Sequence, residues 1–282
     1  MSPHHRSAIL YKRNQLLRHF IPSRWLSRSE FAKFALNFLT MGNAYLERRD
    51  NLASRPMTLR NSPAIHTRAG VEDGVYWWVP GVRQETSFRE NYVFHLLEDD
   101  LRQEIYGIPE YTSALQAGLL NFDATIFRRK YYLNGSHMGY ILYIAEASFE
   151  EADATALEEA LAAGKGAGNF KNMMLHIPGG QEKGVQIIPV GEATAKDEFL
   201  GIKNTTRDDI LASHRVPPVL IGVVPQVAGG FGKPGEAADT FFEAEIVPLE
   251  MRMLEINDWL GVEAVAFAPY QKQAVAAAAP AR

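Results

Sequence analysis

Two short segments combine glycines with a lysine, the composition of loops that bind phosphate groups. They are Gly164–Gly168 (GKGAG) and the triplet Gly232-Lys233-Pro234. A nucleotide-binding P-loop requires the spacing GxxxxGK[ST] between a strand and a helix. The first segment follows an expected helix and lacks this spacing, and in the second Pro234 stands where the hydroxyl residue should be. We therefore predict no ATPase site and interpret the first segment as a flexible linker.

Histidines are the next candidates for chemistry, but they are scattered. His4 and His5 are the only adjacent pair among eight. A metal site on a helix usually needs ligands at positions i and i+4 with carboxylate or cysteine partners, and this pattern does not occur. The chain contains no cysteine, which excludes disulfides and thiolate ligands. We expect His214 to interact with a helix dipole or to pack against its neighbours, and we predict neither a metal site nor a catalytic site.

A third group of candidates is basic. Arg128, Arg129 and Lys130 are consecutive near the end of a predicted helix, where positive charge complements the negative end of the helix dipole. We favour this solvated helix end, or an ion pair between subunits, over direct DNA contact. Lys196, Lys203 and Arg207 would project in similar directions if their helix were continuous, but apolar residues share that arc. The pattern therefore predicts no clean basic stripe.

The bulk composition is that of an ordinary folded protein. Of 282 residues, 46% are hydrophobic and 22% are charged, values typical of globular chains. No apolar run reaches the about 18 residues that a membrane span needs, and the N-terminal residues lack the apolar core of a signal peptide. The net charge is -4, whereas proteins that hold DNA tightly are usually basic. Any DNA contact should therefore be loose.

The N-terminal third predicts two helices followed by strands. Ser27 can cap the second helix, and Glu30 can complete a capping box with it. The break at Gly42-Asn43 precedes a stretch rich in strand-forming and turn residues. The expected elements are helices over about 1–20 and 30–39 and strands within 44–98.

The rest of the chain predicts helices around a small β-rich unit. A turn at 106–109 begins a long helix that Asn134-Gly135 ends, because both residues tolerate the left-handed conformation. Thr205 and Thr206 look like a new N-cap, so we expect two short helices between 194 and 214. Pro248 should kink the last helix. The expected elements are helices over 111–132, 149–163 and 237–261, strands near 139–144, 172–177 and 184–190, a glycine-rich loop at 224–236 and a disordered tail at 274–282.

Ten segments, taken in order along almost the whole chain, carry a family resemblance. They are Tyr11–Asn14, Phe38–Glu47, Val75–Val79, Val93–Glu98, Tyr106–Ile144, Asn169–Met173, Ile187–Pro189, His214–Pro217, Ile246–Leu249 and Glu255–Gly261. Together they resemble tailed-bacteriophage portal proteins, specifically the P2-like (PBSX-type) portal family. The resemblance implies an α+β portal fold with a mixed wing domain (1–110), a stem helix (111–135), a small βαββ clip (136–191), a second helical stem segment (192–223), a tunnel loop (224–236), a kinked C-terminal wing helix (237–261) and a flexible tail (262–282).

The same resemblance implies a structural protein rather than an enzyme, without cofactor or membrane. It implies a homo-oligomeric ring, expected to be a dodecamer, at one vertex of a phage or prophage head. Double-stranded DNA would pass non-specifically through its channel, and the terminase large subunit, capsid or scaffold proteins and head-completion proteins would dock on it. The residues singled out are Gly229, Gly230, Phe231 and Lys233 in the tunnel loop, and Arg128, Arg129, Lys130, Lys196 and Lys203 as candidate channel or inter-subunit basic residues.

Two alternatives stay open on the sequence. An unrelated α+β protein could bind a ligand in a groove beside Trp77 and Trp78, because paired tryptophans can line a pocket. Alternatively, the chain could be an assembly-deficient portal remnant, since Pro3–His5 already resembles an internal part of the family pattern. The mass of the chain in solution separates a ring from both alternatives.

Overall fold

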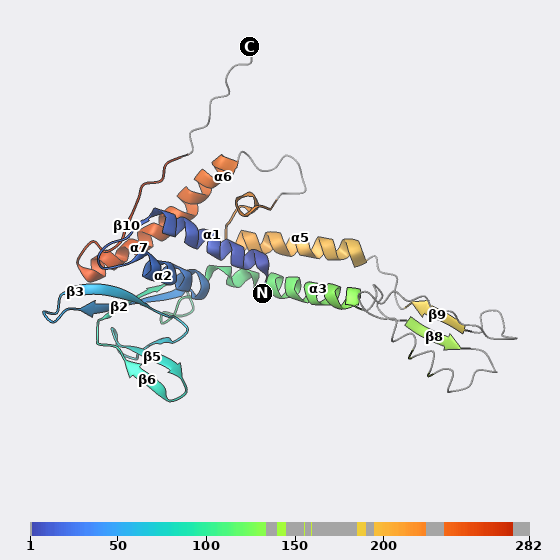
Figure 1. The fold of residues 1–282 in the computed structure, drawn as a ribbon, viewed down its shortest axis with the longest axis horizontal. Helices are drawn as coiled ribbons and strands as arrows, with labels where there is room; N and C mark the ends of the chain where they lie inside the picture. Colours follow the sequence, from blue (N-terminus) through green and yellow to red (C-terminus); the bar gives the residue numbers. More distant parts are fainter. Residues whose placement is uncertain are drawn as a thin grey trace, which may run out of the picture. The chain divides into compact units, whose positions relative to one another are not determined.

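The chain folds into two compact units of mixed α+β structure (Figure 1). The computed structural model describes residues 2–133, 140–144, 155, 159, 185–189, 195–223 and 234–272. The first unit consists of Met1–Gln116 with Asp208–Arg282, and the second of Ala117–Arg207. The first unit thus joins distant parts of the sequence, and the second is one continuous segment.

Two helices begin the first unit, as predicted. They are α1 (Pro3–His19) and α2 (Arg28–Met41). The Ser27 hydroxyl accepts a hydrogen bond from the Glu30 amide at 3.3 Å, the N-cap geometry that satisfies an open helix donor. The Glu30 carboxylate, however, accepts from the Asn61 amide at 2.7 Å and from Lys33. Glu30 therefore fastens α2 to a neighbouring strand instead of completing the expected capping box.

Two antiparallel sheets follow α2, which confirms the strands expected within 44–98. One sheet has β2 (Asn43–Asp50) between β3 (Pro56–Ser62) and β7 (Val93–Leu97). The other has β5 (Tyr76–Gly81) between β4 (Thr67–Ala69) and β6 (Gln84–Ser87). Leu46 and Leu59 bury one face of the first sheet in the main core with α2. On the opposite face Tyr45 packs against Tyr76 of the second sheet, in a smaller cluster.

The C-terminal helices close the main core. α6 (Pro234–Phe241) continues through a π-helical turn (Phe242–Ile246) into α7 (Val247–Leu260). The Val247 amide donates to the Phe242 carbonyl five residues earlier, so the irregular turn precedes Pro248, which has no amide to donate. The side chains of Phe242, Ile246, Met253, Ile256 and Leu260 are buried on one side of these helices, and Leu249 is half-buried there. A short strand, β10 (Ala266–Phe267), then pairs with β1 (Phe20–Ile21).

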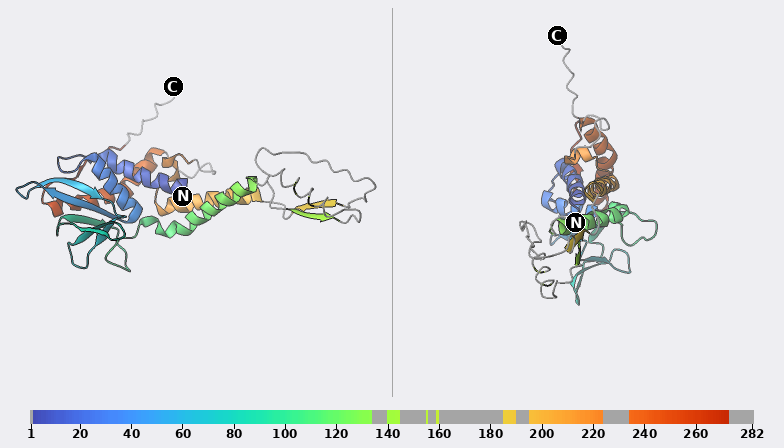
Figure 2. Two further views of the ribbon diagram at one scale, coloured as in Figure 1. Left: turned by 60° about the horizontal axis from the view of Figure 1, so that its bottom comes forward. Right: turned by 90° about the vertical axis from the view of Figure 1, so that its right-hand side faces the viewer.

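The second unit is built on two long helices that lie side by side in Figure 1 and in the left view of Figure 2. The 3-10 turn η1 (Glu110–Ala114) leads into α3 (Leu115–Leu133), and α5 spans Ala195–Ser213. The strands β8 (Tyr140–Ile144) and β9 (Val185–Pro189) pair antiparallel. The expectation of two short helices between 194 and 214 was wrong, because α5 is continuous. A further 3-10 turn, η2 (Pro218–Ile221), follows α5.

Other expected elements lie outside the described residues. They are the helix at 149–163, apart from two isolated positions, the strand at 172–177, most of the glycine-rich loop at 224–236, and the tail at 274–282.

Candidate functional site

The turn at residues 106–109, before α3, is held by hydrogen bonds to Asn43, which follows the end of α2. The Asn43 side chain accepts from the Gly107 amide and donates to the Gly107 carbonyl, both at 2.8 Å. A β-carbon at Gly107 would collide with the Glu98 amide and the Gly42 carbonyl, so only glycine fits this close backbone approach. The Tyr111 hydroxyl then donates to the Thr40 carbonyl at 2.6 Å. The turn and the 3-10 turn η1 are therefore held against the end of α2, within the first unit.

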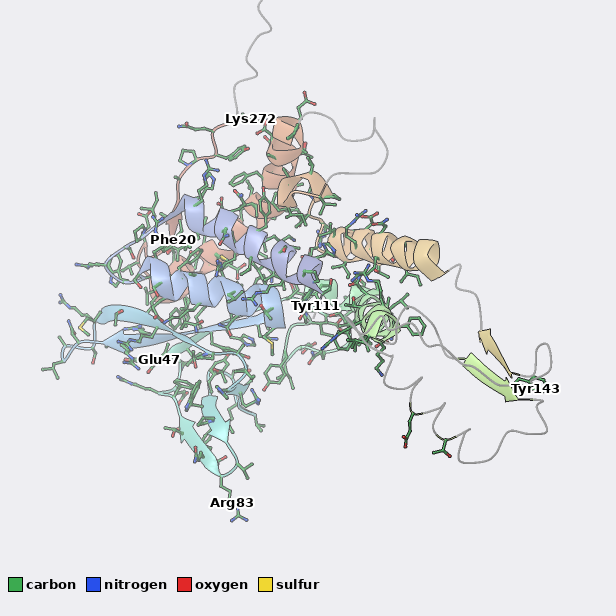
Figure 3. All side chains as sticks on the ribbon, turned by 45° about the vertical axis from the view of Figure 1, so that its right-hand side comes forward. Phe20, Glu47, Arg83, Tyr111, Tyr143 and Lys272 are labelled. Atoms are coloured by element: carbon green, nitrogen blue, oxygen red, sulfur yellow. The ribbon has the colours of Figure 1, made fainter. Side chains whose placement is uncertain are left out.

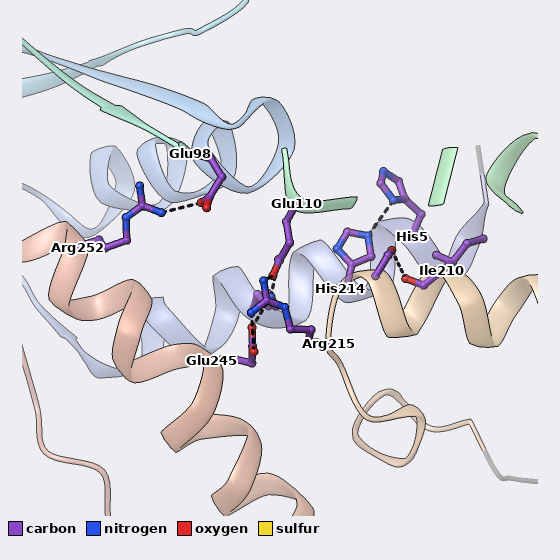
Figure 4. Close-up of polar contacts among 10 residues, drawn as sticks. His5, Glu98, Glu110, Ile210, His214, Arg215, Glu245 and Arg252 are labelled. Carbon is purple, nitrogen blue, oxygen red and sulfur yellow. Dashed lines mark hydrogen bonds and ion pairs between the residues drawn. The ribbon is translucent and has the colours of Figure 1, made fainter. Parts of the chain in front are cut away.

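Four charged side chains meet beside this turn and form what we call the four-charge cluster (Figure 4). Lys12 of α1 contacts Glu110 at 2.8 Å and Glu245 at 3.1 Å. Arg215, two residues beyond the end of α5, contacts the same carboxylates at 2.5 and 3.3 Å. Each basic side chain thus forms ion pairs with both carboxylates, and the cluster links four separated segments within the first unit.

A histidine pair lies next to the four-charge cluster. His214 Nε2 and His5 Nδ1 are 2.9 Å apart, and the rings of both pack on Tyr111. Burial, followed by the positive charges of His5 and Lys12, lowers the pKa of His214 to about 3. Burial also lowers the pKa of His5. Both imidazoles are therefore neutral near pH 7, and one donates to the other. As expected, His214 packs against its neighbours.

Polar side chains join α3 to α5 inside the second unit. Asn121 is buried and donates to the Thr206 hydroxyl at 2.7 Å. Lys203 donates to the side-chain oxygen Oδ1 of Asn121 at 3.0 Å and to the Thr125 hydroxyl at 2.7 Å. Burial, and then the charge of Arg128, lowers the pKa of Lys203. The Lys203 ammonium group thus stabilises the packing of α5 against α3 within one chain.

The opposite side of α3 presents large apolar side chains to solvent. Leu115, Leu119, Phe122 and Ile126 are 52%, 56%, 45% and 37% exposed. Their spacing of four, three and four residues places them on one stripe of a helix with 3.6 residues per turn. Asn121 and Ala124, which are buried, lie about 200° around the helix from Leu119 and Phe122. We call the four exposed residues Leu115, Leu119, Phe122 and Ile126 the α3 stripe.

The other predicted site residues are distributed as follows. Arg129 and Lys130 are exposed and Arg128 is half-buried near the end of α3. Lys196 lies in the first turn of α5. The tunnel-loop residues Gly229, Gly230, Phe231 and Lys233 lie outside the described residues. Among the residues that are described, no three histidine or carboxylate side chains gather into a metal site, and none of the helices has the length and apolar character to cross a bilayer.

Sequence reasoning missed the four-charge cluster. Its members are separated by up to 233 residues, so no spacing along the chain connects them. Glu110, directly after the turn at 106–109, is the one member that local context could have drawn attention to.

Comparisons with known proteins agree with this architecture. The model of the phage portal protein family matches residues 9–273. The probable portal protein of Escherichia phage P2 is 46% identical over 267 residues, covering 95% of this chain and 78% of the relative. The probable portal protein of Haemophilus phage HP1 is 34% identical over 232 residues, covering 80% and 67%.

Solved structures share the fold at much lower identity. A crystal structure of an HK97-family phage portal protein from Corynebacterium diphtheriae is 13% identical, with a TM-score of 0.67 over 95% of this chain and 92% of that one. A chain from the neck of a native gene transfer agent particle, computed with C12 symmetry, is 21% identical, with a TM-score of 0.65 over 96% and 80%. This chain belongs to the phage portal protein family, whose members are structural and not enzymatic proteins.

Proposed function

We propose that this chain is the repeating subunit of a ring-shaped DNA channel at the portal vertex of a tailed phage or prophage. DNA would enter the head through the ring during packaging and leave through it at ejection. The terminase large subunit, capsid or scaffold proteins and head-completion proteins would dock on the ring. The virion would be its final location, and the host cytoplasm its place of assembly.

The α3 stripe is the observation that carries this proposal. Fully burying a leucine, isoleucine or phenylalanine side chain is worth about 1.5 to 3 kcal/mol, and the side chains of the α3 stripe remain 37% to 56% exposed. A neighbouring copy is the occupant that the family membership supports. In a cyclic ring the same stripe is covered on every subunit, because each copy presents it to the next. Twelvefold symmetry in the related gene transfer agent neck supports a dodecamer.

The charge distribution supports a loose hold on DNA. A tight grip needs many phosphate contacts from lysine and arginine, yet the chain carries a net charge of -4. Lys203 already donates hydrogen bonds to Asn121 and Thr125 of its own chain. Arg129 and Lys130 are the exposed basic residues of α3, available to a neighbouring subunit or to passing DNA. Weak contacts throughout the channel suit a duplex that must slide.

The test is the mass of the purified chain by light scattering coupled to size exclusion, with electron-microscopy grids from the same peak. We expect a closed ring with about twelve times the 31.5 kDa of one chain. Phe122→Glu should break the ring into small species, because it places a carboxylate in the α3 stripe. Gln116→Glu is the matched control, since it adds a carboxylate to an exposed position of the same helix outside the stripe.

The two results separate the parts of the proposal. A wild-type chain that stays monomeric overturns the ring. A ring that survives Phe122→Glu as well as Gln116→Glu leaves the ring standing and refutes the α3 stripe as its interface.

A further inference from the structure

An open groove of about 470 Å³ lies between the two sheets of the first unit. Glu47 and Arg49 of β2 and Arg60 of β3 line one side, and Trp78, Thr86 and Arg89 line the other. Figure 3 labels Glu47 on the first of these sheets and Arg83 at the tip of the β5–β6 hairpin. We call this the arginine groove. Phe88, which also lines the groove, packs against the Tyr45 cluster between the two sheets.

Positive charge dominates the arginine groove, although the whole chain is acidic. Three arginines face one carboxylate. Arg49 donates through Nε and Nη2 to the same Glu47 oxygen, at 3.1 and 3.0 Å. Arg60 is exposed and forms no hydrogen bond or ion pair with any residue that the structure describes. Arg89 stacks over the Tyr92 ring at 4.2 Å, which leaves its guanidinium edge available. Arg60 and Arg89 thus form no ion pair with a described carboxylate, although the charge of Arg60 acts on Glu30 and that of Arg89 on Asp50.

The wall formed by β6 has the properties of an open sheet edge. β6 is the last strand of its sheet in the described part of the chain, and all four of its residues are exposed. An exposed edge offers unpaired backbone groups to another extended segment. Trp78 and Thr86 are directly paired across β5 and β6, so both side chains stand on the face that lines the groove. An added strand could therefore bond to β6 and lie beside Thr86, with Trp78 one strand further along the same face.

We propose that the arginine groove docks an extended acidic segment of a partner protein. Its backbone would extend the sheet at β6, and its carboxylates would pair with Arg60 and Arg89, because guanidinium groups hold carboxylates through paired hydrogen bonds. A nucleic acid fits less well, since Glu47 would face its phosphates and its backbone cannot pair with a strand. This docking site is independent of the ring and of the DNA channel.

Fluorescence anisotropy on the full chain tests the site. The probe is a fluorescein-labelled peptide of about ten residues that alternates glutamate and valine, a length that spans β6. Arg60→Glu should weaken binding about tenfold or more, because it replaces an attractive charge by a repulsive one. Arg102→Glu makes the same charge change at an 89% exposed side chain outside the groove, and should leave the affinity within about twofold.

Two further probes distinguish the mode of binding. A peptide N-methylated at alternate residues should not bind, because it cannot pair with a strand edge. An alternating lysine and valine peptide should also fail. The proposal is overturned by no binding up to about 1 mM, by equal binding of the N-methylated or lysine peptide, or by an unchanged affinity of Arg60→Glu. A single-stranded oligonucleotide that displaces the peptide and binds more tightly would identify a nucleic-acid site instead.

Discussion

Lys12 is a buried lysine whose charge is balanced entirely within the four-charge cluster. Its side chain is 2% exposed, whereas that of Arg215, which contacts the same two carboxylates, is 62% exposed. Removing one partner of a buried pair costs about 3 kcal/mol, because the remaining charge stays desolvated. An exposed ion pair contributes about 0.5 kcal/mol. We therefore expect Lys12→Met to destabilise the chain far more than Arg215→Met, as measured by urea unfolding.

The control for this prediction is the double variant Lys12→Met with Glu245→Gln, which removes one charge of each sign. It should recover part of the stability lost by Lys12→Met alone, because the cluster is neutral again. Equal losses for Lys12→Met and Arg215→Met would contradict the importance of burial at this cluster.

Single residues also show where sequence reasoning succeeds. A break was predicted at Gly42-Asn43, and Gly42 ends α2 there in a left-handed conformation with φ of 66°, which glycine adopts without strain. That Asn43 would bind Gly107, sixty-four residues away, had no local signal. The same is true of Lys12 with Glu245. The local backbone conformation can be predicted from the sequence, whereas the pairing of distant polar groups depends on how the whole chain packs.

At the scale of elements, α5 shows how a distant contact overrides a local signal. Thr205 and Thr206 predicted a new N-cap, yet the Thr206 hydroxyl donates to the Ile202 carbonyl within a continuous helix and accepts from Asn121 of α3. The hydroxyl is thus used to join two helices, not to begin one. Helical structure over 111–132 and within 194–214 was nevertheless predicted, and α3 and α5 confirm it.

Thr206→Val tests this contact between helices. The substitution keeps the shape but leaves the buried Asn121 amide without its acceptor, which should cost about 1 to 2 kcal/mol. We expect faster hydrogen exchange in α3 and α5, measured by mass spectrometry. Thr205→Val is the control, since Thr205 is exposed and its change should stay within about 0.5 kcal/mol. Equal exchange rates in the two variants would show that the bond to Asn121 contributes little.

At the scale of the whole molecule, an ordered series of short motifs predicted the portal family, and the family match over residues 9–273 confirms it. The α3 stripe was not predicted as an interface. Its alternation of four and three residues also suits a core helix, and only the folded chain shows that it remains exposed. Burial within one chain and burial between chains produce the same sequence pattern, because both remove apolar surface from water.

The proposed tunnel loop provides the last prediction at this scale. Replacing Gly229 and Gly230 together by valine removes backbone freedom, because a β-branched residue cannot reach most conformations open to glycine. The α3 stripe is untouched, so the ring should assemble normally by light scattering. Retention of packaged DNA, measured as nuclease-protected DNA per head, should fall, because a stiffened loop adapts poorly to a sliding duplex. Alanine at both positions is the milder control and should lie between. Normal DNA retention in the valine variant would refute the assignment of this loop to the duplex, while a lost ring would assign the two glycines to assembly.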